Sequence, residues 1–450
     1  MNKDLTKGPV IWTMLRFAVP MILGNLFQQC YNIADTMIVG KYLGKNALAA
    51  VGSSFTLMTF LTSILLGLCM GSGVVFSIRF GERDEDRLNE SISASFVLIS
   101  GVTALLNMAV FLWIDHIKVL LHVPEEVWEE MRQYLMVIFS GIVATFLYNY
   151  FASLLRAIGN SVVPLFFLIV SVALNIILDF WFVLGLKWGV AGAAGATVIS
   201  QYISGFGIMA YTLWMYPQIR HSFSRCRVSR ACMKEIAGFS FLTCVQQSVM
   251  NLGILMVQGL VNSFGAVIMA AFAAVVKIDA FAYMPVQDFG NAFSTFIAQN
   301  YGAKKDERIR KGLKGAVFVA IVFSAAVSGC VWVFAEQLMG LFVNTKDAAV
   351  GEIIQQGVRY LHIEGAFYVG IGCLFLLYGL YRALGKPGMS VVLTVISLGT
   401  RVILAYMLSS ISFIGVTGIW WAVPIGWLLA DAVGVFYYIC KRKELFCWEV

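Results

Sequence analysis

Charged residues are scarce in this chain. Asp, Glu, Lys and Arg make up 13% of its 450 residues, whereas 60% are hydrophobic. The mean hydropathy is +0.82. Soluble domains carry about 25% charged residues. The composition therefore excludes a soluble protein and indicates an integral membrane protein.

Residues that build metal centres and disulfide frameworks are also few. The four histidines lie far apart, and the nine cysteines form no Cys-x-x-Cys pair and no cluster with histidine. A zinc site, a structural disulfide and a hydrolytic metal centre therefore have no basis. The segment GLYRALGKP from Gly379 comes nearest to a phosphate-binding loop, but it has one residue too many and Pro387 where Ser or Thr would hold magnesium. We expect no enzyme, no ATP-driven transport, no metal and no cofactor.

Long apolar segments are abundant. A helix needs about 20 apolar residues to cross the hydrocarbon core of a bilayer. Twelve such segments are present, six in each half of the chain. Their centres lie near Leu26, Thr62, Thr103, Ile142, Ala173, Ile203, Val249, Tyr283, Ser324, Gly372, Leu398 and Leu428.

The two halves of the sequence repeat each other. LLRAIGN around Arg156 returns as LYRALGK around Arg382, GVAG at Gly189 returns as GVTG at Gly415, and FGERDEDR returns as YGAKKDER. Six helices per repeat give both copies the same orientation. We therefore predict an all-α integral membrane protein, with twelve transmembrane helices in two six-helix lobes related by pseudo-two-fold symmetry about the membrane normal. The N-lobe is predicted over residues 1–215, a basic cytosolic linker over 216–234, and the C-lobe over 235–450.

The basic residues predict the orientation in the membrane. Most of the 32 Lys and Arg lie on the side that carries both termini and the loops after even-numbered segments. The positive-inside rule places this side in the cytosol. We expect a multi-pass protein of the inner (plasma) membrane with cytosolic termini. The same bias explains the net charge of +7 without a nucleic-acid partner, so membrane lipids are the expected surroundings, and we expect a monomer.

Polar residues inside the first six segments mark a candidate site. Segment 1 carries four polar residues at spacings of three and four, which puts them on one helical face; they are Asn25, Gln28, Asn32 and Asp35. Segment 5 carries Asn175 and Asp179 four residues apart, and segment 6 carries Thr197. A carboxylate pair with amide and hydroxyl neighbours is suited to bind and release a cation. The alternative is that these groups only form hydrogen bonds between helices. However, an acid at the bilayer centre costs about 2.5 to 3.5 kcal/mol, and helix packing alone does not need an acid.

The second half has a similar stripe without an acid. Segment 7 carries Gln247, Asn251, Gln258 and Asn262. We therefore expect the ionisable site to be confined to the first lobe. Lys277 and Asp279 lie two residues apart and face different ways. Lys277 is either a counter-charge in the substrate cavity or a side chain that snorkels or lines a cytosolic cleft. Structural roles are expected for Asp288, Glu364 and Asp431.

Four stretches together resemble the multidrug and toxic compound extrusion (MATE) family over essentially the whole chain. They are YNIADTMIVGKYLG, LLRAIGNSVVP, NIILDFWFVLGLKWGVAGAAGATVISQ and FGNAFSTFIAQNYGAKKDERIRKG. The resemblance implies two lobes around a central V-shaped cavity that opens alternately to either side. It also implies export of amphipathic, often cationic, drugs or toxic metabolites in exchange for protons or sodium. The polar side chains assigned to the substrate cavity are Gln28, Asn32, Gln247, Asn251 and Lys277.

The resemblance also assigns coupling residues. In the DinF-like branch the segment 1 acid falls on Asp35, the segment 5 pair on Asn175 and Asp179, and the segment 6 threonine on Thr197. An asparagine of segment 4 is matched to Asn149, although the local spacing differs.

The NorM-like branch differs, because it uses acids in segments 7 and 10. Here Gln247 and Asn251 occupy the first region, YVGIGCLFLLYG in the second is free of acids, and Glu364 lies about a turn and a half too early. The sequence therefore favours the DinF-like branch at the coupling site.

The resulting hypothesis is a proton-coupled antiporter. Protonation of the Asp35 and Asp179 cluster would alter the packing of segment 1, where Pro20 removes a backbone hydrogen bond and makes a bend cheap. A sodium ion near Asp35 and Asp179 is the alternative coupling ion, because carboxylate, amide and hydroxyl oxygens also suit hard cations. A lipid-linked oligosaccharide flippase of the same wider superfamily is the alternative function, but such a flippase would need extra transmembrane segments and a cavity lined by basic residues. A passive channel would need neither paired lobes nor a coupling acid.

Overall fold

A computed structural model describes residues 4–116, 125–224, 228–342 and 349–445. Nearly all of these residues are helical. The elements in chain order are α1 Val10–Tyr42, α2 Lys45–Glu82, α3 Glu85–Leu112, α5 Glu125–Ser140, α6 Ile142–Ala157, α7 Val162–Asp179, the π-helical η1 Phe180–Gly185, α8 Gly189–Met215, α9 Pro217–Ser224, α10 Arg230–Asn262, α11 Ala266–Gly302, α12 Asp306–Val333, α13 Ala335–Phe342, α14 Val350–Gly365, α15 Tyr368–Ala383, α16 Pro387–Ser409 and α17 Val416–Leu445.

The twelve predicted segments all fall on helices, which confirms the predicted fold class. In the described part of the chain, nine helices are long and apolar enough to cross a membrane, and the number rises to eleven when each of two bent pairs counts as one span. The bent pairs are α5 with α6, at 43°, and α14 with α15, at 52°. The remaining predicted segment is α8, which is 27 residues long.

The chain divides into two compact units. The first comprises Met1–Asp4 and Val19–Cys244, and the second comprises Leu5–Ala18 and Val245–Val450. By this division α1 passes from the second unit to the first next to Pro20, and α10 passes from the first unit to the second after Cys244. The predicted linker therefore packs with the first unit: its helix α9 contacts α3. Residues 225–227 of the linker lie outside the described part of the chain.

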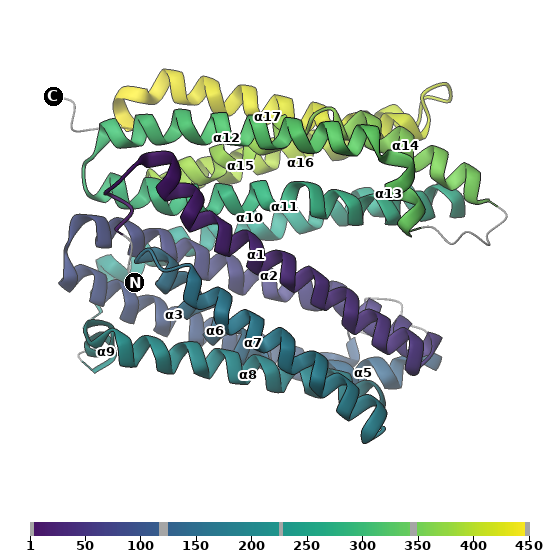
Figure 1. Cartoon of the computed structure of the whole chain (residues 1–450), viewed down its shortest axis with the longest axis horizontal. Coiled ribbons are helices and arrows are strands. Elements are labelled where there is room, and N and C mark those ends of the chain that lie inside the picture. Colours follow the sequence, from purple (N-terminus) through teal and green to yellow (C-terminus); the bar gives the residue numbers. More distant parts are fainter. Residues whose placement is uncertain (1–3, 117–124, 225–227, 343–348, 446–450) are drawn as a thin grey trace. The chain divides into compact units, whose positions relative to one another are not determined.

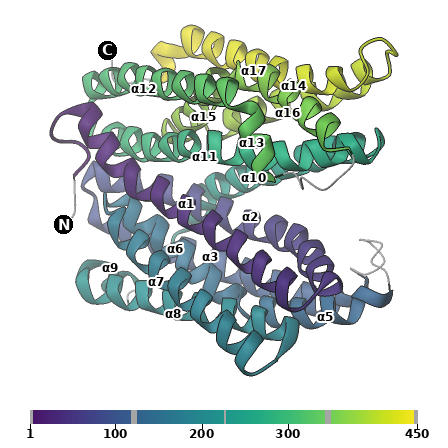
Figure 2. The ribbon, with the colours of Figure 1, turned by 45° about the vertical axis from the view of Figure 1, so that its right-hand side comes forward.

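Packing inside the two units follows the same plan. In the first unit α2 packs on α3 and α6, and α7 packs on α8; the two helices run side by side in both ribbon views (Figure 1, Figure 2). In the second unit α11 packs on α12 and α15, and α16 packs on α17. The sequence repeat is thus a repeat of helix contacts.

The turns repeat as well, because residues with positive φ recur at matching places in the two halves. The pairs are Gly44 with Gly265, Arg83 with Lys304, Gly159 with Gly385, and Gly189 with Gly415. Gly159 ends α6, where the Asn160 N–H donates to the Leu155 carbonyl at 2.8 Å; Gly385 ends α15, where the Lys386 N–H donates to the Tyr381 carbonyl at 2.8 Å. This is a Schellman end, which requires a left-handed residue and so favours glycine. It explains why LLRAIGN and LYRALGK share their glycine.

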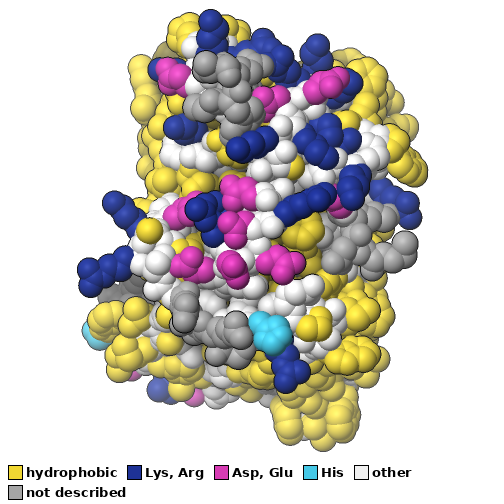
Figure 3. Space-filling view, turned by 90° about the vertical axis from the view of Figure 1, so that its left-hand side faces the viewer, with side chains coloured by type: hydrophobic (Ala, Val, Ile, Leu, Met, Phe, Trp, Pro, Cys, Tyr) yellow, Lys and Arg dark blue, Asp and Glu magenta, His cyan; other side chains and the backbone are white. Residues whose placement is uncertain are grey.

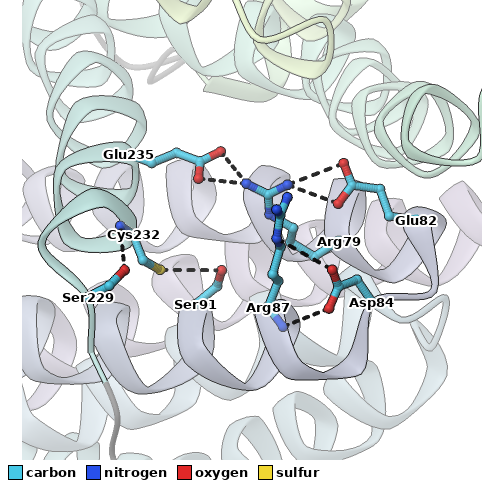
Figure 4. A network of polar contacts seen from close by, with 8 residues as sticks. All are labelled: Arg79, Glu82, Asp84, Arg87, Ser91, Ser229, Cys232 and Glu235. Carbon is cyan, nitrogen blue, oxygen red and sulfur yellow. Dashed lines mark hydrogen bonds and ion pairs between the residues drawn. The ribbon is translucent and has the colours of Figure 1, made fainter.

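In the first unit the start of α10 is clamped onto the corner between α2 and α3 (Figure 4). Arg79 donates from Nη2 to both carboxylate oxygens of Glu235, at 2.8 and 2.7 Å, and from Nη1 to Glu82 at 2.9 Å. The backbone N–H of Ser229 donates to Glu90 at 2.8 Å. A bidentate guanidinium–carboxylate pair fixes orientation as well as distance.

In the second unit the corresponding corner, between α11 and α12, holds residues 5–8. Arg308 donates to the carbonyl oxygens of Gly8, Leu5 and Lys7, at 2.7, 3.0 and 3.1 Å. Lys305 donates to the Thr6 carbonyl at 2.9 Å. In each unit, the corner that carries the repeated motif FGERDEDR or YGAKKDER therefore contacts the chain around the start of the first long helix of a repeat.

Side chains on the outside of the helices are sorted by type. Large hydrophobic side chains are widely exposed, for example Trp214 at 80% and Phe318 at 64%. Charged side chains gather on the face drawn in Figure 3, and hydrophobic side chains cover the flanks beside it. Broad apolar flanks beside a charged face are what a lipid-embedded protein requires.

Candidate functional site

The candidate site is built from α1, α7 and α8 of the first unit. It contains Asp35 of α1, Asn175 and Asp179 of α7, and Thr197 of α8, with exposed fractions of 8, 2, 0 and 3%. Asn175 and Asp179 share a face because four residues are about one helical turn. The structure thus brings together four of the polar residues that the sequence singled out in segments 1, 5 and 6.

A chain of hydrogen bonds links side chains of α1, α8 and α7. The amide nitrogen of Asn175 donates to Asp179 Oδ2 at 3.0 Å, and its amide oxygen accepts from the backbone N–H and the hydroxyl of Thr197, both at 3.2 Å. This amide orientation satisfies both neighbours. The Thr197 hydroxyl is 3.3 Å from the hydroxyl of Tyr31. Because the Thr197 proton is used toward Asn175, Tyr31 donates to Thr197.

The two carboxyl groups are incompletely bonded. Asp35 Oδ1 and Asp179 Oδ1 are buried and have no hydrogen-bond partner. Asp35 and Asp179 are close enough to interact as like charges. Charging both at once in a buried site is unfavourable unless a cation is bound between or beside them. The site can therefore hold a proton or a small cation and release it.

Two tyrosines of this site escaped the sequence analysis. Tyr31 lies one turn before Asp35 on the same face of α1, a spacing that could have identified it. Tyr134 of α5 is 4% exposed and interacts electrostatically with Asp35, Asp179 and Tyr31. Nothing in the sequence near Tyr134 points to this contact, because α5 opens with the acidic run EEVWEE.

The α-helix of α7 ends at Asp179, directly before the π-helical turn η1. In η1 the Leu186 N–H donates to the Trp181 carbonyl at 2.9 Å, five residues back. π-helical turns inside helices are frequent at functional sites. The wider turn begins directly after Asp179, whose carboxyl group belongs to the site.

Asn149, assigned to the same network by resemblance, is bonded within its own helix. Its amide nitrogen donates to the Thr145 carbonyl of α6 at 2.8 Å, and the side chain is half-buried.

The residues assigned to a substrate cavity are spread over three helices. On α1, Gln28 is exposed and Asn32 is half-buried, with its amide nitrogen donating to Gln29 at 3.2 Å. On α10, Gln247 and Asn251 are half-buried. Lys277 of α11 is exposed. The cavity assignment stays a prediction.

Metal ligands are not grouped in the described part of the chain. Within residues 4–116, 125–224, 228–342 and 349–445, no three His, Cys, Asp or Glu side chains come together as a metal site. The Asp35 and Asp179 pair, with Asn175 and Thr197, is the cluster that could take a single small cation.

Comparison with known proteins decides the family. The sequence model of the MatE family matches residues 20–181 and 240–407, one stretch in each half of the chain. The chain belongs to the MATE family of transporters. MATE proteins are membrane transporters and not enzymes.

Relatives of this MATE protein are similar over nearly their whole length. The "Probable multidrug resistance protein YpnP" of Bacillus subtilis is 29% identical over 441 residues, which are 97% of this chain and 96% of the relative. The "Multidrug export protein MepA" of Staphylococcus saprophyticus is 26% identical over 445 residues, 98% of this chain and 96% of the relative. A solved multidrug resistance MATE family transporter of the MOP superfamily, in an outward-facing conformation, has a TM-score of 0.91 with 24% identity and covers 98% of each chain. This last likeness shows the shared two-lobe fold.

Proposed function

We propose that this MATE protein is a secondary active multidrug efflux antiporter that exports amphipathic, often cationic, compounds in exchange for protons. The observation that carries the proposal is the buried pair Asp35 and Asp179, each with an unpartnered carboxylate oxygen. Asp179 is hydrogen-bonded to Asn175, and the charges of Asp35 and Asp179 interact. The relatives described as multidrug resistance and export proteins support the direction of transport and the substrate class.

The chemistry of the proposed step is a proton exchange. A proton that enters from the outside binds to one carboxylate of the pair and removes the like-charge repulsion between Asp35 and Asp179. Its release to the inside restores the charge. In the neutral form the protonated carboxyl gains one O–H donor and keeps acceptor oxygens, so it can donate one hydrogen bond that the carboxylate could not. Substrate and proton then compete because each stabilises a different charge state of the same cluster.

Asn175 and Thr197 position the acid. Asn175 donates to Asp179 Oδ2 and is itself held by two donors from Thr197. Because Tyr31 of α1 donates to Thr197, a change at Asp179 reaches α1 through three hydrogen bonds. Pro20 of α1 lies inside the helix, where its missing N–H weakens the backbone ladder and lowers the cost of bending. We propose that α1 changes its packing when the cluster is protonated. We propose that the coupling site is of the DinF-like type.

Sodium is the second candidate for the coupling ion. Carboxylate, amide and hydroxyl oxygens from Asp35, Asp179, Asn175 and Thr197 are hard ligands that suit Na⁺ as well as H⁺.

The proposed setting is the inner (plasma) membrane, with both termini in the cytosol and a monomer surrounded by lipid. It is supported by the excess of Lys and Arg on the side of the termini. The partners are small-molecule drugs or toxic metabolites.

The test is proton movement in liposomes that contain the purified protein, driven by an ethidium gradient with sodium absent and then present. We expect proton flux without sodium in the wild type and its loss in Asp35→Asn, since the amide cannot exchange a proton. Asp86→Asn, which removes an exposed acid at the start of α3, is the matched control and should transport like the wild type.

Proton-coupled ethidium transport by Asp35→Asn at the wild-type rate would contradict the assigned site. Flux that requires sodium would support an efflux antiporter that is coupled to sodium and not to protons. Absence of any cation-driven flux in the wild type would favour the lipid-linked oligosaccharide flippase.

A further inference from the structure

The first turns of α1 pack on α12 within the second unit, and the two helices run in the same direction there (Figure 1). Just before the helices begin, Lys305 donates to the Thr6 carbonyl at 2.9 Å. Further along, a Cβ atom on Gly315 of α12 would lie 2.7 Å from Cγ1 of Ile11. Residue numbers rise together in both partners, so α1 and α12 are parallel at this contact.

One side of the contact between Ile11 and Gly315 is open. Two exposed residues of α1 are rotated from Ile11 by about 100° and 140° around the helix axis. Three exposed residues of α12 are rotated from Gly315 by about 40° to 100° in the opposite sense. Because the helices are parallel, opposite rotations bring all five residues to the same side. This open face consists of Trp12, Arg16, Lys311, Lys314 and Phe318.

The other side of the same contact is closed. Met14 of α1 and Ala316 of α12 are rotated to that side, and both are 0% exposed. The two helices therefore bury one flank in the second unit and present the other flank outward. The open face is a property of the packed unit and not of either helix alone.

The open face carries positive charge without matching acids. Lys311 pairs with Glu307 at 2.6 Å. Within the part of the chain that the structure describes, Arg16 and Lys314 have no acid partner. The acids of α12 are Glu307 and Asp306, both in its first turn. Two guanidinium or ammonium groups are thus free to bind an anion.

The free cations lie at the end of the charged part of each helix. After Lys314 the rest of α12 is uncharged as far as its last residue, Val333. After Arg16 the sequence of α1 is uncharged until Asp35. About 20 apolar residues cross the hydrocarbon core, so Arg16 and Lys314 lie at the boundary between the core and the headgroups.

A large aromatic side chain lies one turn from each free cation. Trp12 is four residues before Arg16 and 63% exposed; Phe318 is four residues after Lys314 and 64% exposed. Exposed aromatic side chains are favourable at the headgroup level and against acyl chains. Arginine and lysine recognise phosphate, and basic sites between membrane helices bind acidic headgroups. The open face therefore matches both halves of a phospholipid.

We propose that the open face binds one anionic phospholipid of the adjacent leaflet. Arg16 and Lys314 share its phosphate, and its acyl chains lie against Trp12 and Phe318. The lipid thereby bridges α1 and α12. Because it binds the folded chain, it stabilises the second unit by mass action. This inference does not depend on which ion drives transport.

The test is native mass spectrometry of the purified full chain in detergent, titrated with phosphatidylglycerol. The measured quantity is the dissociation constant of the most tightly bound lipid. In Arg16→Gln/Lys314→Gln we expect binding to weaken about 25-fold, because each charge contributes about fivefold. Zwitterionic phosphatidylethanolamine should bind the wild type and this variant equally. Unchanged binding of phosphatidylglycerol would overturn the proposal.

Two further variants separate a built site from general attraction between basic residues and acidic lipid. Arg442→Gln/Lys443→Gln removes the same charge from exposed positions in the last turn of α17 and should leave phosphatidylglycerol binding unchanged. Arg16→Lys/Lys314→Arg keeps the charge and should bind nearly as the wild type does. An equal loss in the α17 variant would show only general attraction and would contradict a site on α1 and α12.

The aromatic part of the site has its own test. Trp12→Ala should weaken phosphatidylglycerol and phosphatidylethanolamine by the same factor, because the substitution removes an apolar contact and no charge. A loss confined to phosphatidylglycerol would contradict the assigned acyl-chain contact.

Thermal unfolding checks the folding of the variants and the nature of the ligand. In phosphatidylethanolamine, Arg16→Gln/Lys314→Gln should melt at the wild-type temperature. Added phosphatidylglycerol should raise the melting temperature of the wild type and not that of this variant. Inorganic phosphate should have no such effect; an equal rise with inorganic phosphate would assign the face to a free anion and overturn the lipid proposal.

Discussion

At the scale of single residues, the candidate site depends on one hydroxyl. Thr197 connects Tyr31 of α1 to Asn175 of α7, and through Asn175 to Asp179. Replacing this hydroxyl, which accepts one hydrogen bond and donates another, by an isosteric methyl removes one hydrogen bond from each of its two partners. The surrounding groups are buried, so water does not substitute freely.

Thr197→Val should therefore destabilise the protein by about 1 to 3 kcal/mol, the cost of buried polar groups that lose their partner. It should also slow proton-coupled ethidium transport, because α1 loses its link to Asp179. Thermal unfolding and liposome flux measure the two effects. Thr197→Ser keeps the hydroxyl and should behave nearly like the wild type; equal effects of Ser and Val would contradict the role of the hydroxyl.

At the scale of helices, contact depends on small residues. A Cβ atom on Gly426 of α17 would lie 2.4 Å from the carbonyl oxygen of Ser397 in α16, whereas a Cβ atom on Gly399 of α16 would meet nothing within 4 Å. Close backbone approach is how helices associate in a membrane, where lipid competes equally for apolar side chains.

Gly426→Ala should cost about 1 to 3 kcal/mol by forcing α16 and α17 apart. Gly399→Ala is the matched control and should be neutral or slightly stabilising, since alanine favours helix by up to about 1 kcal/mol over glycine. The measurement is the melting temperature of each variant in the same detergent. A fall in melting temperature for Gly399→Ala as large as that for Gly426→Ala would contradict the packing argument.

The clamp on α10 gives a second prediction at this scale. Glu235→Gln removes the charge that Arg79 holds bidentately, and Glu82 remains as its partner. Because Glu235 is 38% exposed, the expected loss is no more than about 1 kcal/mol. The difference in melting temperature from the wild type should shrink at high ionic strength. Glu307→Gln, which breaks an exposed pair with Lys311, should show no comparable salt-dependent loss.

At the scale of the whole molecule, the charge bias predicts which ends face the cytosol. Asp86, at the start of α3, and Glu126, at the start of α5, are both exposed and belong to ends predicted to lie on opposite sides of the membrane. In a cysteine-free background, Glu126→Cys should react with a membrane-impermeant maleimide in intact cells. Asp86→Cys should react only after permeabilisation. The reverse pattern would contradict the positive-inside assignment.

The sequence by itself determined the class of the protein and most of its plan. Hydropathy located twelve segments that all fall on helices, because a bilayer demands about 20 apolar residues from each span whatever its neighbours are. The repeat predicted matched halves, and the shared turns at Gly159 and Gly385 follow from a local requirement for positive φ. Helical spacing also placed Asn175 and Asp179 on one face. These features are local, so the sequence carries them directly.

Only the tertiary structure decided which polar faces meet. The contact of Tyr31 with Thr197, and the place of Tyr134 beside both acids, depend on how α1, α5 and α8 pack. The sequence analysis expected a structural role for Glu364, and only the packing of α14 on α11 shows that its carboxyl group lies beside that of Asp279. Partners brought together by packing leave no periodic signal in either segment, whereas burial and spacing within one helix do.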